Sequence, residues 1–324
     1  MQRYLIERPK TVGDSGVYFQ GSHYYIYLYI RDIMEPNAKS NPSDVQITIT
    51  NPCGTDIVTD DTMSNITTGE YSYDTDLSSS AYYGKYTVKI STITHKSTSY
   101  FDFYVLPWNA VPEIRRLSGI EEWKSISDED IAIIFWNCFT EVRNLVFNKH
   151  HDVKPRVDPD TGRWFDGTTT EFRTKHRYLA DYDLDGSYTQ TDTSCHIACQ
   201  GDIDGWWLDD NYERQALVVT IDDAEEGKIH LYQSDGVTAI PRTQCGVFLT
   251  YWTEYHTYNS MNFKEAVEYL SAHKIAQRFH ETDRATLVDI QTNKTIFVTD
   301  PNRLSQLYKE ALSRIREPLC GGAS

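Results

Sequence analysis

The stretch that decides the fold is Cys245-Gly-Val-Phe-Leu-Thr-Tyr-Trp-Thr-Glu-Tyr-His-Thr-Tyr-Asn-Ser-Met-Asn-Phe-Lys-Glu-Ala-Val-Glu-Tyr-Leu-Ser-Ala-His-Lys-Ile-Ala276. Its first part alternates apolar and polar residues, which predicts a strand. From Phe263 onward, apolar residues recur at helical spacing, and Asn262 with Glu265 has the pattern of a capping box. The sequence therefore predicts a strand that leads into a helix over about 262–280.

Two further helices are predicted on either side of this stretch. Ser127 is a good N-cap, three acidic residues follow it, and apolar residues then recur at helical spacing, so a helix is expected over about 127–147. Asp300-Pro301 combines a capping acid with a proline at the first helical position and predicts a helix over about 301–316. The three helices together predict a small bundle.

Between the helix expected at about 127–147 and the helix expected at about 262–280, the sequence predicts a large β/loop insertion over about 150–255. Alternating patches near 216–221, 228–232 and 246–252 favour three strands of an antiparallel sheet. The stretch from about 150 to 214 is rich in Asp, Thr and Gly and is expected to be mostly loop.

The N-terminal part, residues 1–108, reads as all-β. His23-Tyr-Tyr-Ile-Tyr-Leu-Tyr-Ile30 is rich in β-forming residues, and Val45-Gln-Ile-Thr-Ile-Thr-Asn51 alternates with period two. About seven short strands punctuated by turns are typical of a β-sandwich. Pro107 and Pro112 are expected to stiffen a linker to a second domain, 109–324. The expected fold class is α+β: a β-sandwich followed by a helical bundle with a β/loop insertion.

The charge of the chain limits its partners. Its 324 residues carry a net charge of −16, which argues against tight nucleic-acid binding. A surface past which DNA slides without adhering is compatible with this charge, and so is a plain contribution to solubility. No apolar run approaches the length of a membrane-spanning helix, so no membrane partner is expected.

One acidic loop has the spacing of a calcium site. Asp181, Asp183, Asp185 and Asp192 occupy positions 1, 3, 5 and 12 of a loop with glycine at position 6. Calcium, the one cofactor the sequence suggests, needs several such oxygen ligands. The alternative is an acidic surface turn.

Aromatic residues indicate contact surfaces, because the chain has 23 tyrosines and 7 tryptophans. Tyr251, Trp252 and Tyr255 are expected where the β insertion meets the bundle or an adjacent subunit. Trp206 and Trp207 are expected to form a contact or the core of the insertion. No phosphate loop, nucleophile elbow, HExxH or dinucleotide motif occurs, so no catalytic residue is assigned and no enzyme is expected.

Two resemblances follow from these motifs. The pattern Val45-x-Ile-x-Ile-x-Asn-Pro-x-Gly54, followed by Gly69-x-Tyr71 and Gly84-x-Tyr86, resembles immunoglobulin-like domains of bacterial surface proteins and macroglobulins. The remainder resembles the head–tail adaptor (connector) proteins of tailed phages and archaeal tailed viruses. The resembling elements are Leu117-Ser-Gly-Ile120 before the acidic-capped helix, the aromatic strand, and the two C-terminal helices.

The adaptor resemblance implies a structural virion protein of the neck, assembled in the host cytoplasm. Such proteins form a ring, commonly twelve-fold, that contacts the portal protein on one side and a neck or tail completion protein on the other. Viral DNA passes through the ring without sequence-specific binding. The C-terminal segment, including Leu319, would contact the portal. The alternative is a calcium-stabilised binding module that recognises glycan or a protein partner through the β-sandwich, and a hydrolase using the acidic loops is a third hypothesis.

Overall fold

The computed structural model of this chain contains helices and strands, with strands in the majority. It describes residues 4–7, 16–19, 22–34, 38–76, 83–93, 96–121, 126–157, 165–182, 188, 190, 201–241, 246–255, 258–281, 286–289 and 294–316. Within these residues there are four helices and eighteen strands. The mixed α/β class is therefore observed.

The chain divides into two compact units. The first comprises Met1–Trp136, His196–Ala198 and Ser271–Pro301, and the second comprises Asn137–Cys195, Cys199–Leu270 and Asn302–Ser324. Helices α2 (Asp128–Val146) and α3 (Ser260–Glu281) each contribute residues to both units. The boundary expected from sequence, at residue 108, lies two residues beyond the last strand of the sandwich.

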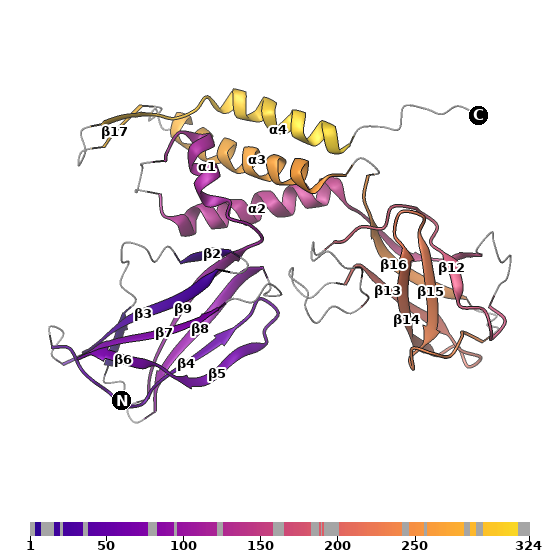
Figure 1. Cartoon of the computed structure of the whole chain (residues 1–324), viewed down its shortest axis with the longest axis horizontal. Helices are drawn as coiled ribbons and strands as arrows, with labels where there is room; N and C mark the ends of the chain where they lie inside the picture. The colour runs from indigo at the N-terminus through magenta and orange to yellow at the C-terminus, as the bar shows by residue number, and fades with distance from the viewer. Residues whose placement is uncertain are drawn as a thin grey trace. The chain divides into compact units, whose positions relative to one another are not determined.

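The first unit contains two sheets that share one core, with strands visible in Figure 1. The order in one sheet is β1-β3-β7-β6, and in the other it is β2-β9-β8-β4-β5. Their bounds are β1 Tyr4–Glu7, β2 Val17–Phe19, β3 His23–Asp32, β4 Val45–Thr50, β5 Asp56–Thr62, β6 Ser64–Thr67, β7 Glu70–Asp76, β8 Gly84–Thr92 and β9 Ser97–Leu106.

Alternation along β3 explains this architecture. Tyr24, Ile26, Leu28 and Ile30 are fully buried, whereas the residues between them point to the opposite face of the sheet. The buried set packs with residues of the second sheet, including Phe103, whose ring centroid lies 4.5 Å from that of Tyr24. Burial of one face from each sheet creates the sandwich core.

Helix α1 (Val111–Ser118) also belongs to the first unit and was not expected, because its prolines suggested a linker. Pro112 stands in the first turn, where no N–H is needed. Gly119 ends the helix at φ 75°, and the backbone N–H groups of Gly119 and Ile120 bond to Arg116 and Arg115 carbonyls. The Leu117-Ser-Gly-Ile120 motif is thus a helix C-terminus. The first unit also contains the antiparallel hairpin of β17 (Thr286–Asp289) and β18 (Lys294–Phe297).

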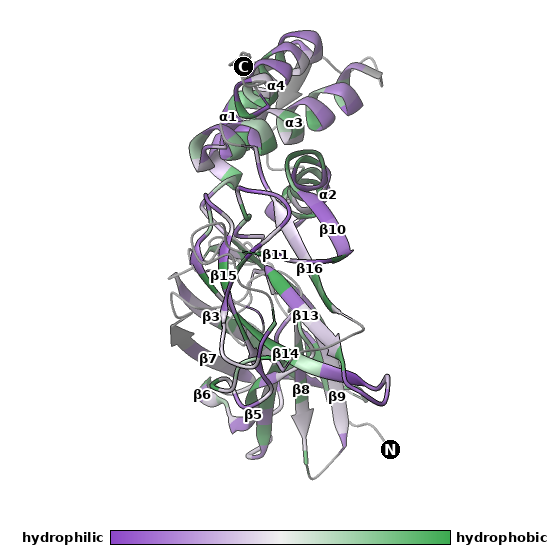
Figure 2. Cartoon of the chain, turned by 90° about the vertical axis from the view of Figure 1, so that its right-hand side faces the viewer, coloured by the Kyte–Doolittle hydropathy of each residue, from purple (hydrophilic) through white to green (hydrophobic). Residues whose placement is uncertain are grey.

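The second unit contains a seven-stranded sheet of order β10-β16-β13-β14-β15-β12-β11. The bounds are β10 Asn148–Val153, β11 Arg156–Val157, β12 Glu171–Arg173, β13 Ile203–Leu208, β14 Arg214–Asp223, β15 Lys228–Gln233 and β16 Val247–Thr253. The expectation of a loop over 150–214 was therefore wrong for β10 to β13. Figure 2 shows why β10 is hard to recognise, because the strand is almost wholly hydrophilic.

Local chemistry sets the helix starts. Ser127 caps α2: its hydroxyl accepts the Asp130 N–H at 3.1 Å, and the Asp130 carboxylate accepts the Ser127 N–H at 3.3 Å. Asn262 does not cap α3. The helix begins at Ser260 instead, with the side chain of Asn259 accepting the Met261 N–H at 2.7 Å. The last helix, α4, spans Pro301–Ile315.

Candidate functional site

The end of β16 and the turn into α3 gather several of the residues expected from sequence. We call this group the junction cluster: Arg143, Lys149, Asp181, Tyr182, Trp252, Glu254 and Tyr258. Cross-strand pairing places Lys149 of β10 opposite Trp252 of β16. Segment 178–182 runs beside the same strand, because the Ala180 N–H bonds to the Trp252 carbonyl and the Glu254 N–H bonds to the Tyr178 carbonyl.

Four side chains of the junction cluster form one stack. The rings of Trp252 and Tyr182 lie parallel, with centroids 3.8 Å apart and an interplanar angle of 5°. Lys149 Nζ lies 5.0 Å from the Trp252 ring centroid, and the Arg143 guanidinium carbon lies 4.2 Å from the Tyr182 ring centroid. The order is cation, ring, ring, cation, so each ring has one face covered by a ring and the other by a positive charge.

The stack joins the sheet to α2. Arg143 belongs to the last turn of α2 and is 8% exposed, and Lys149 lies in the first strand after that helix. The Asp202 carboxylate accepts the Tyr182 N–H at 2.5 Å and is itself 2% exposed. These contacts hold segment 178–182 between the helix end and the sheet.

Two acids lie at the other end of the cluster. Burial raises the pKa of Glu254 to about 8, and the nearby Asp181 carboxylate adds to the shift. Burial also raises the pKa of the Tyr258 hydroxyl, with further contributions from Glu254 and Asp181. Glu254 therefore keeps its proton at pH 7, which the sequence did not indicate.

A histidine pair lies on the opposite face of β16 and was also missed from sequence. The rings of His150 and His176 stack with centroids 3.8 Å apart. His176 Nδ1 lies 2.9 Å from the Tyr251 hydroxyl, and His150 Nε2 lies 2.8 Å from the Thr253 hydroxyl. Burial lowers the pKa of both histidines, so they are neutral at pH 7.

The predicted contact residues differ in what they can offer to a partner. Tyr251 and Trp207 are 1% and 8% exposed and pack in the core of the seven-stranded sheet, so neither side chain presents a surface. Trp252 is half-buried in the stack. Tyr255 is half-buried beside the end of α4, where the Arg316 guanidinium donates to its hydroxyl at 3.4 Å. Leu319 lies outside the described residues.

Trp206 has most of its ring covered by side chains of the same sheet. It stacks on Phe248 at 4.4 Å and 22°, and the Arg214 guanidinium carbon lies 4.7 Å from its centroid. Its indole N–H donates to the Asp152 carboxylate at 3.0 Å, and Lys154 Nζ lies 5.7 Å from the Phe248 ring. On this outer face the order is therefore Lys154, Phe248, Trp206, Arg214. As in the junction cluster, a cation lies at each end of two stacked rings.

The calcium expectation falls mainly outside the described residues, where Asp183, Asp185 and Asp192 lie. Asp181 is described and belongs to the junction cluster. In the part of the chain that the structure describes, no group of three or more His, Cys, Asp or Glu residues is arranged to hold a metal ion.

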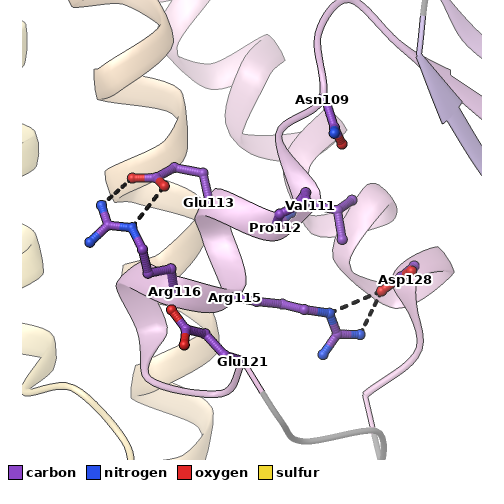
Figure 3. A pocket seen from close by; sticks show the side chains of 8 residues that line it. All are labelled: Asn109, Val111, Pro112, Glu113, Arg115, Arg116, Glu121 and Asp128. Atoms are coloured by element: carbon purple, nitrogen blue, oxygen red, sulfur yellow. Dashed lines mark hydrogen bonds and ion pairs between the residues drawn. The ribbon is translucent and has the colours of Figure 1, made fainter. Parts of the chain in front are cut away.

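A separate cavity of about 570 Å³ lies beside α1 in the first unit (Figure 3). Its charged side chains are largely paired with each other. Arg115 donates to Asp128 at 2.6 and 3.0 Å and to the Ile126 carbonyl at 2.7 Å, while Arg116 pairs with Glu113. Because both guanidinium groups are engaged, the cavity offers no strong anion site.

Comparisons with known proteins do not place the chain in a family. No family model and no curated protein matches it. Among solved structures, the Lin-41 filamin domain matches 33% of this chain and 95% of its own length, with 17% identity and a TM-score of 0.26. Trypsin-activated α2-macroglobulin from Escherichia coli matches 79% of this chain and 14% of its own length, with 10% identity and a TM-score of 0.26. The titin M1 domain matches 28% and 84%, with 16% identity and a TM-score of 0.18. At such scores we draw no conclusion about fold or function from them.

Among the helices of the described residues, none has both the length and the apolar character needed to cross a bilayer.

Proposed function

We propose that this chain is the head–tail adaptor of a tailed virus and acts as a structural protein with no catalytic residue. The observation that carries the proposal is the order of elements after the sandwich. Helices α1 and α2 come first, strands β10 to β16 follow as one sheet, and α3, the hairpin β17-β18 and α4 come after it. Helices on both sides of a large β insertion are the arrangement that the sequence resemblance to adaptors implies.

Contacts between distant helices support a bundle. Phe263, in the first turn of α3, lies 5.4 Å from Phe139 and 6.1 Å from Phe147 between ring centroids, although the whole sheet separates these residues in sequence. The start of α3 also contacts α4, because Arg314 bonds to Asn262 at 3.3 Å and to Glu265 at 3.2 Å. Both contacts lie within the second unit, and they join the start of α3 to the end of α2 and to α4.

In this proposal the N-terminal sandwich is immunoglobulin-like and the chain forms a homo-oligomeric ring, twelve-fold in the resembling family. The ring contacts the portal protein and a neck or tail completion protein. The net charge of −16 lets viral DNA pass without adhering. The junction cluster links the end of α2 to the seven-stranded sheet, because its stack joins Arg143 of the helix to Trp252 of β16 through Tyr182.

The test uses the full chain, alone and mixed with the portal protein of the same virus. Mass photometry and negative-stain microscopy are expected to show rings, and a ring–portal complex when the portal is present. A chain that stays monomeric in both samples contradicts the proposal.

A pair of tail variants tests the contact with the portal. Deletion of residues 317–324 is expected to leave ring formation intact and to abolish portal binding. A control variant replaces the same residues by a Gly-Ser segment of equal length, so that loss of binding in both variants assigns the effect to the side chains. Unchanged portal binding in both contradicts the role given to the tail.

A further inference from the structure

The outer face of the sheet β1-β3-β7-β6 carries a row of tyrosines. Tyr25, Tyr27 and Tyr29 alternate with the buried residues of β3 and therefore all lie on the face away from the core. An antiparallel sheet with one face on the core normally has polar residues on the other face. Here the middle of that face holds three aromatic rings, and Tyr25 is 41% exposed.

The rings form a continuous row. The centroids of Tyr25 and Tyr27 are 6.5 Å apart with an interplanar angle of 18°, and those of Tyr27 and Tyr29 are 5.3 Å apart and nearly perpendicular. Three alternate residues of a strand span roughly 13 Å. Exposed Leu5 of β1 and Ile66 of β6 belong to the neighbouring strands of the same sheet.

Hydrogen-bonding groups border each ring. Register places Glu70 opposite Tyr29, Ser72 opposite Tyr27 and Asp74 opposite Tyr25. The Tyr27 hydroxyl donates to the Glu70 carboxylate, which raises the pKa of Tyr27. Lys39 bonds to the same carboxylate, and the two hydrogen bonds lower the pKa of Glu70 to about 2. The row therefore interleaves apolar ring surface with fixed polar groups.

The charges of this face are compensated within the face itself. Arg31 pairs with Glu7 at 3.3 Å, Lys39 pairs with Glu70, and His23 lies 3.8 Å from Asp74. Each of these three carboxylates therefore has a basic side chain beside it, and Lys39 Nζ also lies 5.4 Å from the centroid of the Tyr29 ring. A face whose charges are paired in this way attracts strongly charged partners only weakly.

We propose that this tyrosine face binds a neutral oligosaccharide. A pyranose ring has apolar C–H faces, which pack on aromatic rings, and hydroxyl groups around its edge, which bond to carboxylate, hydroxyl and ammonium groups. The row offers both at alternating positions over roughly 13 Å. A protein interface would instead be expected to have an apolar centre and a polar rim.

This inference is separate from the adaptor proposal, which assigns neither ring formation nor portal binding to the tyrosine face. A virion protein with such a face would attach to neutral cell-surface polysaccharide. The two proposals fail independently, since one is measured by assembly and the other by sugar binding.

The test applies the full chain to an array of neutral hexose and N-acetylhexosamine oligomers with sialylated and sulfated counterparts. Calorimetry with cellohexaose, maltohexaose and chitohexaose follows. We expect binding to at least one neutral oligomer. Tyr25→Ala combined with Tyr27→Ala is expected to weaken it at least about tenfold, whereas Tyr25→Phe keeps the ring and the binding.

Tyr100→Ala is the matched control, because Tyr100 is 66% exposed on β9, in the other sheet of the sandwich. It is expected to bind as the unchanged chain does. Tyr25→Ala alone serves if the double variant fails to fold. Binding to none of the neutral oligomers, binding only to acidic ones, or equal losses in the Tyr25 and Tyr100 variants overturns the proposal.

Discussion

Two sheets carry a row of aromatic side chains on their outer face, and the neighbours of the two rows differ. In the seven-stranded sheet, Trp206 and Phe248 stack on each other, and Arg214 and Lys154 cover their outer sides. In the sandwich, Tyr25 stacks on Tyr27 and remains 41% exposed, while Lys39 pairs with Glu70 and lies 5.4 Å from the centroid of the Tyr29 ring at the other end of the row. A count of aromatic residues therefore does not identify an interface. What matters is how much of each ring its neighbours cover.

The largest expected effect on stability comes from Tyr251, which belongs neither to the Trp206–Phe248 row nor to the tyrosine row of β3. Tyr251→Ala removes a buried ring from the core of the seven-stranded sheet, and we expect the free energy of unfolding to fall by about 3–5 kcal/mol. Tyr251→Phe removes only the hydroxyl that meets His176 and is expected to cost about 1 kcal/mol. Urea denaturation of both variants checks the difference. Equal small losses would show that the ring is not part of the core.

The second effect is a pH dependence that originates in Glu254. Burial raises the pKa of its carboxyl to about 8 in the folded chain from the ordinary glutamate value of about 4.5, so the folded state binds more protons between these pH values. The free energy of unfolding is therefore expected to fall as pH rises through this window, by about 2 kcal/mol after allowance for partial exposure.

Glu254→Gln isolates this contribution, because glutamine does not titrate. The half-buried His150 and His176 have lowered pKa values and act in the opposite direction, so the difference between variant and unchanged chain is the relevant quantity. Thermal melts from pH 5 to pH 9 are expected to show that the variant gains stability relative to the unchanged chain as pH rises. A constant difference would show that Glu254 titrates normally.

A smaller effect on stability is expected from the row of Trp206 and Phe248, whose rings are covered by cations. Trp206→Ala removes the stack on Phe248, the contact with Arg214 and the hydrogen bond to Asp152, and should cost about 1–2 kcal/mol. Chemical denaturation measures this loss. A neutral result would mean that the cation–ring–ring–cation row adds no stability, and the contrast between the two faces would disappear.

The smallest effect on stability is expected from Tyr25, the exposed end of the tyrosine row of β3. Tyr25→Ala should change the free energy of unfolding by about 0.5 kcal/mol or less, because the side chain is 41% exposed and its ring stacks on Tyr27 at the relatively long centroid distance of 6.5 Å. Parallel denaturation of this variant and Trp206→Ala sharpens the comparison. A loss as large as that of Trp206→Ala would indicate that Tyr25 is structural and would weaken the case for a binding face.

Sequence reasoning succeeded where a single local rule sufficed. Helical spacing and a capping serine indicate a helix near 127–147, and α2 spans Asp128–Val146. A capping acid followed by proline indicates the start of α4 at Pro301. It failed for α1, although Pro112 near the start and Gly119 after the end are the signals of a short helix.

Two of the four strands missed between about residues 150 and 214 have a clear physical reason. β10 is hydrophilic because most of its residues are exposed, so it shows no alternation that would reveal a strand. In β13, Gly205 occupies an inward position where a side chain would approach Leu217 within 2.6 Å, and its absence weakens the hydrophobic pattern. Trp206 and Trp207 appeared as one apolar patch, although they lie on opposite faces of that strand.

The sequence by itself determined that β3 and β16 have two unlike faces and that three amphipathic helices follow the sandwich, because periodicity is a local property of the chain. Only the tertiary structure decided which aromatic residues are covered. Tyr251 became core, Trp252 and Trp206 became parts of cation-lined stacks, and Tyr25 stayed exposed. The reason is that burial depends on which cross-strand and distant residues face each ring, and these partners are set by the pairing of strands that are far apart in the sequence.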